Sequence, residues 1–159
     1  MSTRAQALAG RVEQGARQLA AFVEGLSDAQ WRMVCPEDGR PVGVLVHHVA
    51  SAYQVEIDLV RKLASGEAIT GVTWAMVDQM NAAHGKDQAH VTKAAALELL
   101  RRQSAMAASA IRALSDEQLD RAAPVSLNWD APLTAQYFIE EHPLGHSFHH
   151  LANIKAAVA

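Results

Sequence analysis

The sequence predicts an all-α protein built as a four-helix bundle. Alanine, the strongest helix former, is abundant, and aromatic residues make up only 5% of the 159 residues. Four long stretches repeat apolar residues at the three- and four-residue spacing that lines one face of a helix. β-branched residues are scattered and do not form the alternating runs of strands, so no strand is predicted.

Capping and turn residues bound the four long helices. These helices are expected at residues 3–24, 42–64, 92–114 and 134–157. Pro41 suits the first turn of the second helix. Pro143 lies inside the last helix and should kink it. Helices of this number and length favour a bundle with one core.

The connections complete a single domain over residues 1–159. A short helix is expected over 74–84 and a loop over 120–133. Residues 27–30 and 115–118 both place a serine three positions before a glutamine, each time after a long helix. We interpret this echo as a reused N-cap that starts a short turn, and not as a repeat of the domain.

Charge and hydropathy exclude several classes of partner. The net charge is −3, from 14 lysines and arginines against 17 aspartates and glutamates, and no basic cluster is present, which argues against nucleic-acid binding. No apolar run is long enough to cross a membrane, and the N-terminal stretch lacks the apolar centre of a signal peptide. We therefore expect a cytoplasmic protein with neither a nucleic acid nor a membrane as its partner.

Histidine is the outlier of the composition. Of the 8 histidines, two are adjacent, His47 and His48, and four more fall between residues 142 and 150. Residues three, four and seven positions from His48 are apolar, among them Val44 and Leu45, so His48 is predicted to point into the bundle. The corresponding neighbours of His47 are small or polar, so His47 is predicted to point outward.

The last helix carries an inward pair of histidines, His146 and His150. Side chains at i and i+4 share a face, with their Cβ atoms roughly 5–6 Å apart, which lets two imidazoles reach one metal ion. His149 falls outside the apolar arc, about 100° from His150 around the helix. A His142–His146 pair has the same spacing but lies nearer the polar edge and next to Pro143, so we favour His146 and His150.

His48, His146 and His150 are therefore the predicted ligands of one divalent metal ion. A site with three protein ligands keeps a coordination position open, as catalytic sites do. Neutral imidazoles favour a transition metal, and zinc or nickel is the expected ion. The competing interpretation is that these side chains are hydrogen-bonded core histidines, which is the common role of a lone histidine on an apolar face.

Two segments carry a resemblance to a known family. Residues 145–154, GHSFHHLANI, are similar to the H-x-x-x-H motif of the DinB-like superfamily, which includes mycothiol-dependent maleylpyruvate isomerase. Residues 44–50, VLVHHVA, are similar to the family's second-helix segment, and the match selects His48 rather than His47. Residues 78–84 also resemble a stretch of actinobacterial members.

The resemblance covers nearly the whole chain. It implies an up-down-down-up bundle, a metal ion held by the three histidines, and a homodimer. Characterised relatives include thiol-dependent isomerases and thiol S-transferases, so a low-molecular-weight thiol is a further expected cofactor. The isomerase carries an additional domain after this one, so its substrate chemistry need not carry over.

Three functions fit the sequence. The first is a metal-dependent enzyme, either a thiol-dependent transferase or isomerase or a hydrolase, that acts on a small electrophilic substrate through an activated water or thiol. The second is a non-catalytic dimeric stress-response protein that binds a metal or a small molecule. The third is a structural bundle whose histidines bind nothing.

Further site residues are less constrained by the pattern, and no catalytic acid or base can be assigned. The irregular connections, where binding residues often lie, offer four pocket candidates whose more common role is packing or loop surface: Trp74, Asn81, His84 and Trp129. Three polar residues could orient an imidazole through its other nitrogen or lie on solvated surface: Glu140, Glu141 and Asn153.

Overall fold

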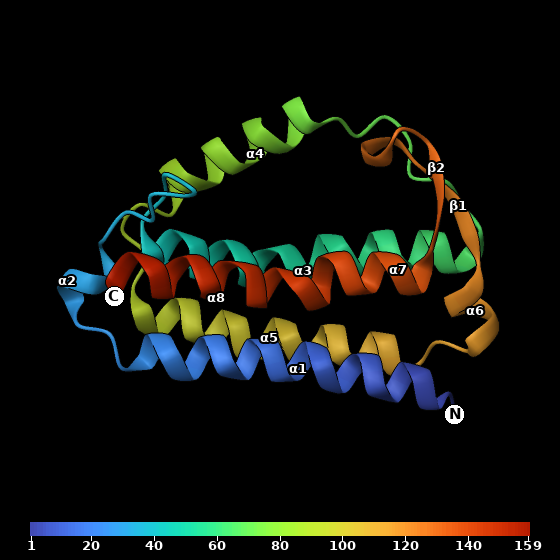
Figure 1. The fold of residues 1–159 in the computed structure, drawn as a ribbon, viewed down its shortest axis with the longest axis horizontal. Helices are drawn as coiled ribbons and strands as arrows, with labels where there is room; N and C mark the ends of the chain where they lie inside the picture. The colour runs from blue at the N-terminus through green and yellow to red at the C-terminus, as the bar shows by residue number, and fades with distance from the viewer.

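The computed structural model describes residues 1–159 and confirms the four-helix bundle (Figure 1). The long helices are α1 (Thr3–Glu24), α3 (Val42–Ser65), α5 (Lys93–Arg112) and a composite last helix of α7 (Ala135–Ile139), η2 (Glu140–Leu144) and α8 (Gly145–Val158). α1 and the last helix run in one direction, and α3 and α5 run in the other. This arrangement is the up-down-down-up order. No helix combines the length and the apolar character needed to span a membrane.

One continuous hydrophobic core lies between the four helices. α5 packs against both α1 and α3, and α1 also packs against α8. Each large apolar side chain that is fully buried stabilises the fold by about 1.5–3 kcal/mol. Every long helix supplies such side chains, among them Leu19, Ile57, Leu100 and Ile154. At Gly15 a Cβ atom would lie 2.9 Å from the Phe148 ring, so glycine lets α1 and α8 approach closely.

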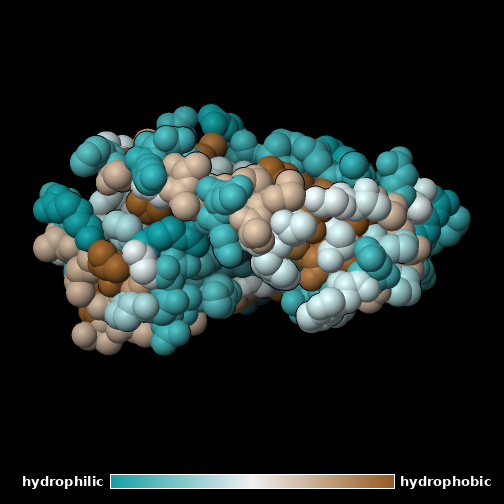
Figure 2. All heavy atoms as spheres, turned by 90° about the horizontal axis from the view of Figure 1, so that it is seen from above, coloured by the Kyte–Doolittle hydropathy of each residue, from teal (hydrophilic) through white to brown (hydrophobic).

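α4 (Trp74–Asp87) joins the parallel helices α3 and α5 in the chain and runs back along the outside of the bundle (Figure 1). The helix predicted over 74–84 is confirmed and continues to Asp87. None of its residues is fully buried. Seen from the α4 side, the surface is mainly hydrophilic, with hydrophobic atoms in small separate patches (Figure 2). α4 is thus a cover on the bundle and not a part of its core.

Residues 120–133 are not a simple loop, and the prediction that no strand exists is wrong. β1 (Ala122–Val125) and β2 (Ala131–Thr134) form an antiparallel pair around the 3-10 turn η1 (Ser126–Asn128). Pro124 and Pro132 lie directly opposite each other. Neither has an N–H group, so this pair must be one that makes no ladder hydrogen bond. The Pro124 carbonyl instead accepts a hydrogen bond from the Ile69 amide at 2.9 Å, which ties the hairpin to the segment after α3.

The two short helices confirm the predicted reuse of capping residues. α2 (Asp28–Trp31) and α6 (Asp116–Asp120) each begin with a capping box. The serine hydroxyl accepts a hydrogen bond from the amide three residues later, and the glutamine side chain accepts one from the serine amide. The two caps lie at opposite ends of the bundle, where they start the turns after α1 and α5 (Figure 1).

The predicted kink at Pro143 is a π-helical turn, η2. Proline lacks the N–H that the α-helical ladder requires, and a wider turn accommodates the missing bond. A Cβ atom at Gly145 would lie 3.0 Å from the Glu140 carbonyl oxygen, so a glycine fits the end of this turn. The turn ends two residues before His146, and π turns of this kind frequently lie at functional sites.

Candidate metal centre

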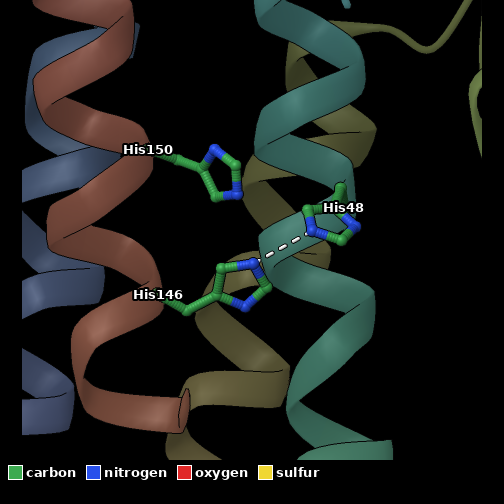
Figure 3. A group of neighbouring side chains, drawn as sticks. All are labelled: His48, His146 and His150. Atoms are coloured by element: carbon green, nitrogen blue, oxygen red, sulfur yellow. Dashed lines mark hydrogen bonds between the residues drawn. The ribbon is translucent and has the colours of Figure 1, made fainter. Parts of the chain in front are cut away.

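Three histidine side chains from two neighbouring helices converge (Figure 3). His48 comes from α3, and His146 and His150 come from α8. One ring nitrogen from each lies within 4.8 Å of the other two. The Nε2 atoms of His48 and His146 are 2.9 Å apart. We call these three side chains the histidine cluster; they are the three that the sequence singled out from eight.

The histidine cluster fits one tetrahedral transition-metal ion. Nitrogens that each bind zinc at about 2.0–2.1 Å lie roughly 3.3 Å apart at tetrahedral angles. That separation falls between the 2.9 Å contact and the 4.8 Å limit of the cluster. In His150 the Nε2 atom is turned toward the other two rings, and Nδ1 points away from them (Figure 3). The cluster therefore has the donor type and spacing that a metal ion needs, with small side-chain adjustments.

Burial keeps two of these imidazoles uncharged. Burial, followed by the charge of neighbouring groups, lowers the pKa of His48 to about 2. The same causes lower the pKa of His150 to about 3, and its side chain is only 4% exposed. An imidazole must be neutral to bind a metal ion. Both rings are thus in the ligand form at neutral pH.

Glu56 is the site residue that the sequence analysis missed. Its Oε1 atom accepts a hydrogen bond from Nδ1 of His146 at 2.9 Å, and the residue is 8% exposed. With its hydrogen on Nδ1, His146 turns the lone pair of Nε2 toward His48. Glu56 lies two turns after His48 on α3, next to the buried Ile57. The sequence signal that could have indicated Glu56 is a carboxylate among the apolar residues that line one face of a long helix.

None of the three residues predicted as possible outer partners makes a hydrogen bond to a ring of the cluster, although Glu140 and Glu141 line the hollow beside His146. Glu140 pairs with Arg11 at 3.3 Å. Asn153 contacts His149 at 3.4 Å, on the surface. Glu141 is exposed. Glu56 is therefore the carboxylate that orients an imidazole of the cluster.

A buried hydrogen bond fixes α8 against α3 beside the cluster. The Tyr53 hydroxyl and the Ser147 Oγ atom are 2.6 Å apart, and both residues are fully buried. Ser147 follows His146 directly in the sequence. The bond therefore fixes the position of α8 along α3 at the place where the ligands project.

The other histidines of the last helix lie outside the cluster. The ring of His142 packs on Phe138, with ring centroids 4.2 Å apart, and burial lowers its pKa. η2 separates His142 from the regular spacing of α8. His149 is exposed, as its position on the helix predicted. The alternative His142–His146 pair is not the one that meets His48.

His47 points away from the cluster, as its position on the helix predicted, and it lies against α4 rather than in open solvent. Its Nδ1 atom lies 2.8 Å from Nε2 of His84 on α4. The His84 ring is also 5.8 Å from the ring of His48, centroid to centroid. Burial lowers the pKa of both His47 and His84. α4 therefore covers the side of α3 that carries His47.

Of the four predicted pocket residues, the structure brings His84 beside the cluster, with Asn81 one turn away on the same, partly buried face of α4. Trp74 begins the helix, roughly three turns and about 15 Å from His84. Its indole N–H donates to the Leu127 carbonyl at 3.2 Å, which fastens α4 to η1. Trp129 is 92% exposed, and its backbone is left-handed, at φ 56°. The two tryptophans thus lie away from the cluster.

Two features flank the cluster. The loop before α3 places Arg40 close enough for its charge to lower the pKa of both His48 and His150. On another side, a polar hollow of about 390 Å³ contains no hydrophobic residue. Its lining includes both His146 and Glu56. Small polar molecules can reach these two residues through the hollow.

Two solved structures share this fold. YfiT from Bacillus subtilis, described as a probable metal-dependent hydrolase with an unusual four-helix bundle topology, matches with a TM-score of 0.79 and 19% identity over 99% of this chain and 87% of its own. The sibling lethal factor precursor DfsB matches with a TM-score of 0.75 and 17% identity over 98% of this chain and 95% of its own. At these identities the likeness establishes the fold alone.

Sequence comparison adds the family. No curated protein sequence matches this chain. The family model of the DinB superfamily matches residues 11–154, which span both helices that carry the histidine cluster. The chain therefore belongs to the DinB superfamily.

Proposed function

We propose that this protein is a metal-dependent enzyme whose ion is held by His48, His146 and His150. The convergence of three imidazole nitrogens within 4.8 Å is the observation that carries the proposal. A hydrogen-bonded core role accounts for His146, which has partners on both ring nitrogens. It does not account for His150, which is only 4% exposed and yet makes no hydrogen bond.

A divalent ion here supplies a Lewis acid that lowers the pKa of a water or thiol. The surrounding residues hold the ligands in place. Glu56 fixes the ring of His146, and the hydrogen bond between Tyr53 and Ser147 fixes the helix that carries it. The other carboxylate oxygen of Glu56, Oε2, has no hydrogen-bond partner. It is available to accept a proton released beside His146.

The reaction class that we propose is attack of water or a low-molecular-weight thiol on a small electrophilic substrate. The hollow beside His146 suits a small molecule in size. Hydrolysis is supported by YfiT, which shares the fold and is described as a probable metal-dependent hydrolase. Thiol transfer and isomerisation are supported by the family resemblance. Zinc or nickel is the proposed ion, since both suit imidazole ligands.

The test begins with metal content. The protein would be purified without a metal-binding tag and its metals measured by elemental mass spectrometry, before and after treatment with zinc or nickel. We expect close to one ion per chain. The loaded protein would then be assayed for ester hydrolysis and for conjugation of thiols to a chloronitrobenzene, with and without a chelator.

The outcomes separate the three candidate functions. Turnover that disappears with the chelator and returns with metal supports the enzyme. One tightly held ion without turnover supports the non-catalytic binding protein. The absence of metal, even after reconstitution, contradicts the proposal and leaves a structural bundle. Homodimerisation and a cytoplasmic location stay predictions, which gel filtration and cell fractionation would test.

A further inference from the structure

Arg40 uses only part of its guanidinium within the protein. Its Nε and Nη2 atoms bind the carboxylate of Asp38, the latter at 2.8 Å. The Nη1 atom is buried and has no hydrogen-bond partner. The side chain is only 18% exposed, so solvent does not readily satisfy this donor. A buried guanidinium nitrogen without an acceptor is costly, which indicates a missing partner.

Like Arg40, His84 has one buried nitrogen without a hydrogen-bond partner. Its Nε2 atom contacts Nδ1 of His47 at 2.8 Å, whereas its own Nδ1 atom is buried without a partner. When His47 donates in this contact, His84 carries its hydrogen on Nδ1 and is itself a donor. The pair then offers one free N–H group beside the histidine cluster.

The two unpartnered nitrogens belong to neighbouring side chains. Arg40 lies along the end of α4, since a Cβ atom at Gly85 would be 4.0 Å from its Cδ atom. The positive charge of Arg40 lowers the pKa of His84 and of His48. The ring of His84 is 5.8 Å from that of His48. Both side chains therefore lie beside the cluster.

The charges around the cluster favour a singly charged anion at these donors. Arg40 and Asp38 neutralise each other, and the imidazoles of His48 and His150 are neutral. A divalent ion next to the carboxylate of Glu56 leaves one positive charge. A carboxylate balances this charge and presents planar oxygen acceptors to a guanidinium. The hollow on the side of Glu56 is lined by further glutamates and repels such a group.

We propose that Arg40 and His84 bind a carboxylate of the substrate and thereby hold its reactive part against the metal site. The inference deepens the proposed function and rests on it, because the carboxylate belongs to the molecule on which that site acts. The substrate class is then a small electrophile that carries a carboxylate group. Arg40 contributes Nη1 and His84 contributes Nδ1, while Asp38 and His47 hold the two side chains in position.

Acetate is a suitable probe because it carries the carboxylate and little else. The protein would be loaded with cobalt(II), and binding of ¹³C-acetate would be measured from paramagnetic relaxation of its NMR signals. Acetamide, the neutral analogue, serves as the ligand control. Arg40→Gln and His84→Gln each remove a proposed donor. Arg61→Gln and His90→Gln, at exposed positions, are the matched controls.

We expect the Kd for acetate to rise about tenfold or more in both donor variants, since hydrogen bonds to charged groups are the strong ones. The control variants should keep the wild-type Kd, acetamide should bind much more weakly, and every variant should keep its cobalt content. If loss of the Arg40–Asp38 ion pair prevents the Arg40→Gln protein from folding, His84→Gln still tests the inference. This variant should fold, because α4 contributes no fully buried residue.

Wild-type acetate affinity in the donor variants, or no acetate binding to cobalt-loaded wild type, would overturn the inference. In either case an intact cobalt content leaves the proposed function standing. Failure of the wild-type protein to bind cobalt contradicts both the proposed function and the carboxylate site that rests on it.

Discussion

Two adjacent histidines on α3 have entirely different surroundings. His48 faces α8, where His146 and His150 complete a cluster of three rings. His47 faces α4, where His84 is its one hydrogen-bonded partner. α3 and α8 are fixed by a shared core and by a buried hydrogen bond, whereas α4 buries no residue completely.

The difference shows how packing, and not residue type, separates a candidate ligand from a residue at the rim. A metal ion requires donors held within a fraction of an ångström, which rigid packed helices provide. The His47–His84 pair lies between the bundle and its cover. It is suited to contact a substrate that enters there, and not to hold an ion alone.

Replacing each of the two histidines in turn should give the largest difference between the two regions. His48→Ala should weaken zinc affinity by more than about a hundredfold, beyond the effect of changing an outer partner. His47→Ala should leave the affinity unchanged. Competition with a chromophoric chelator would measure both. Equal effects of the two substitutions would contradict the assignment of the ligands.

The outer partner of His146 should have the next largest effect. Glu56→Gln keeps the shape of the side chain but weakens the hydrogen bond that orients the imidazole. We expect zinc affinity to fall about 10–100-fold. Glu141→Gln, at an exposed position beside the same hollow, is the control in the same titration. Unchanged affinity in Glu56→Gln would show that the ring is oriented by other means.

The hydrogen bond between α3 and α8 should contribute to stability more than to metal affinity. Tyr53→Phe leaves the buried Ser147 hydroxyl without its partner, which should lower the free energy of unfolding by about 1–3 kcal/mol. Urea denaturation measures the change. Tyr137→Phe, where the side chain is exposed, should have almost no effect. A similar loss in both variants would exclude a special role for the buried bond.

Substitution of Trp129, the most exposed of the predicted pocket residues, should have the smallest effect on stability and metal affinity. Trp129→Ala should change the free energy of unfolding by less than about 0.5 kcal/mol, as surface substitutions usually do. Zinc affinity and any turnover should be unchanged. A loss of turnover with intact zinc content would instead support the sequence-based prediction that Trp129 contacts the substrate.

The helices and the cluster were predictable because both follow from the periodicity of helices. Apolar residues spaced three and four apart defined the four long helices, and the same spacing separated His48 from His47. His146 and His150 share a face in any helix. None of these inferences required knowledge of how the helices meet.

The features that sequence could not supply depend on tertiary contacts. Pro124 and Pro132 hid two short strands, because proline normally excludes a strand, and only their mutual pairing removes the conflict. α4 has no fully buried residue, so no apolar stripe marked the face that covers His47. Glu56 was not predicted because the site was inferred from the spacing of histidines, although the apolar neighbours of Glu56 on α3 mark its face as buried.

X-ray absorption at the zinc edge of the loaded protein tests the central claim most directly. The account predicts three imidazole nitrogens at about 2.0–2.1 Å, with one additional light ligand at the open position. His150→Ala should reduce the imidazole contribution by one third. A shell of oxygen ligands without imidazole scattering, or a spectrum indifferent to the loss of His150, would contradict the three-histidine site.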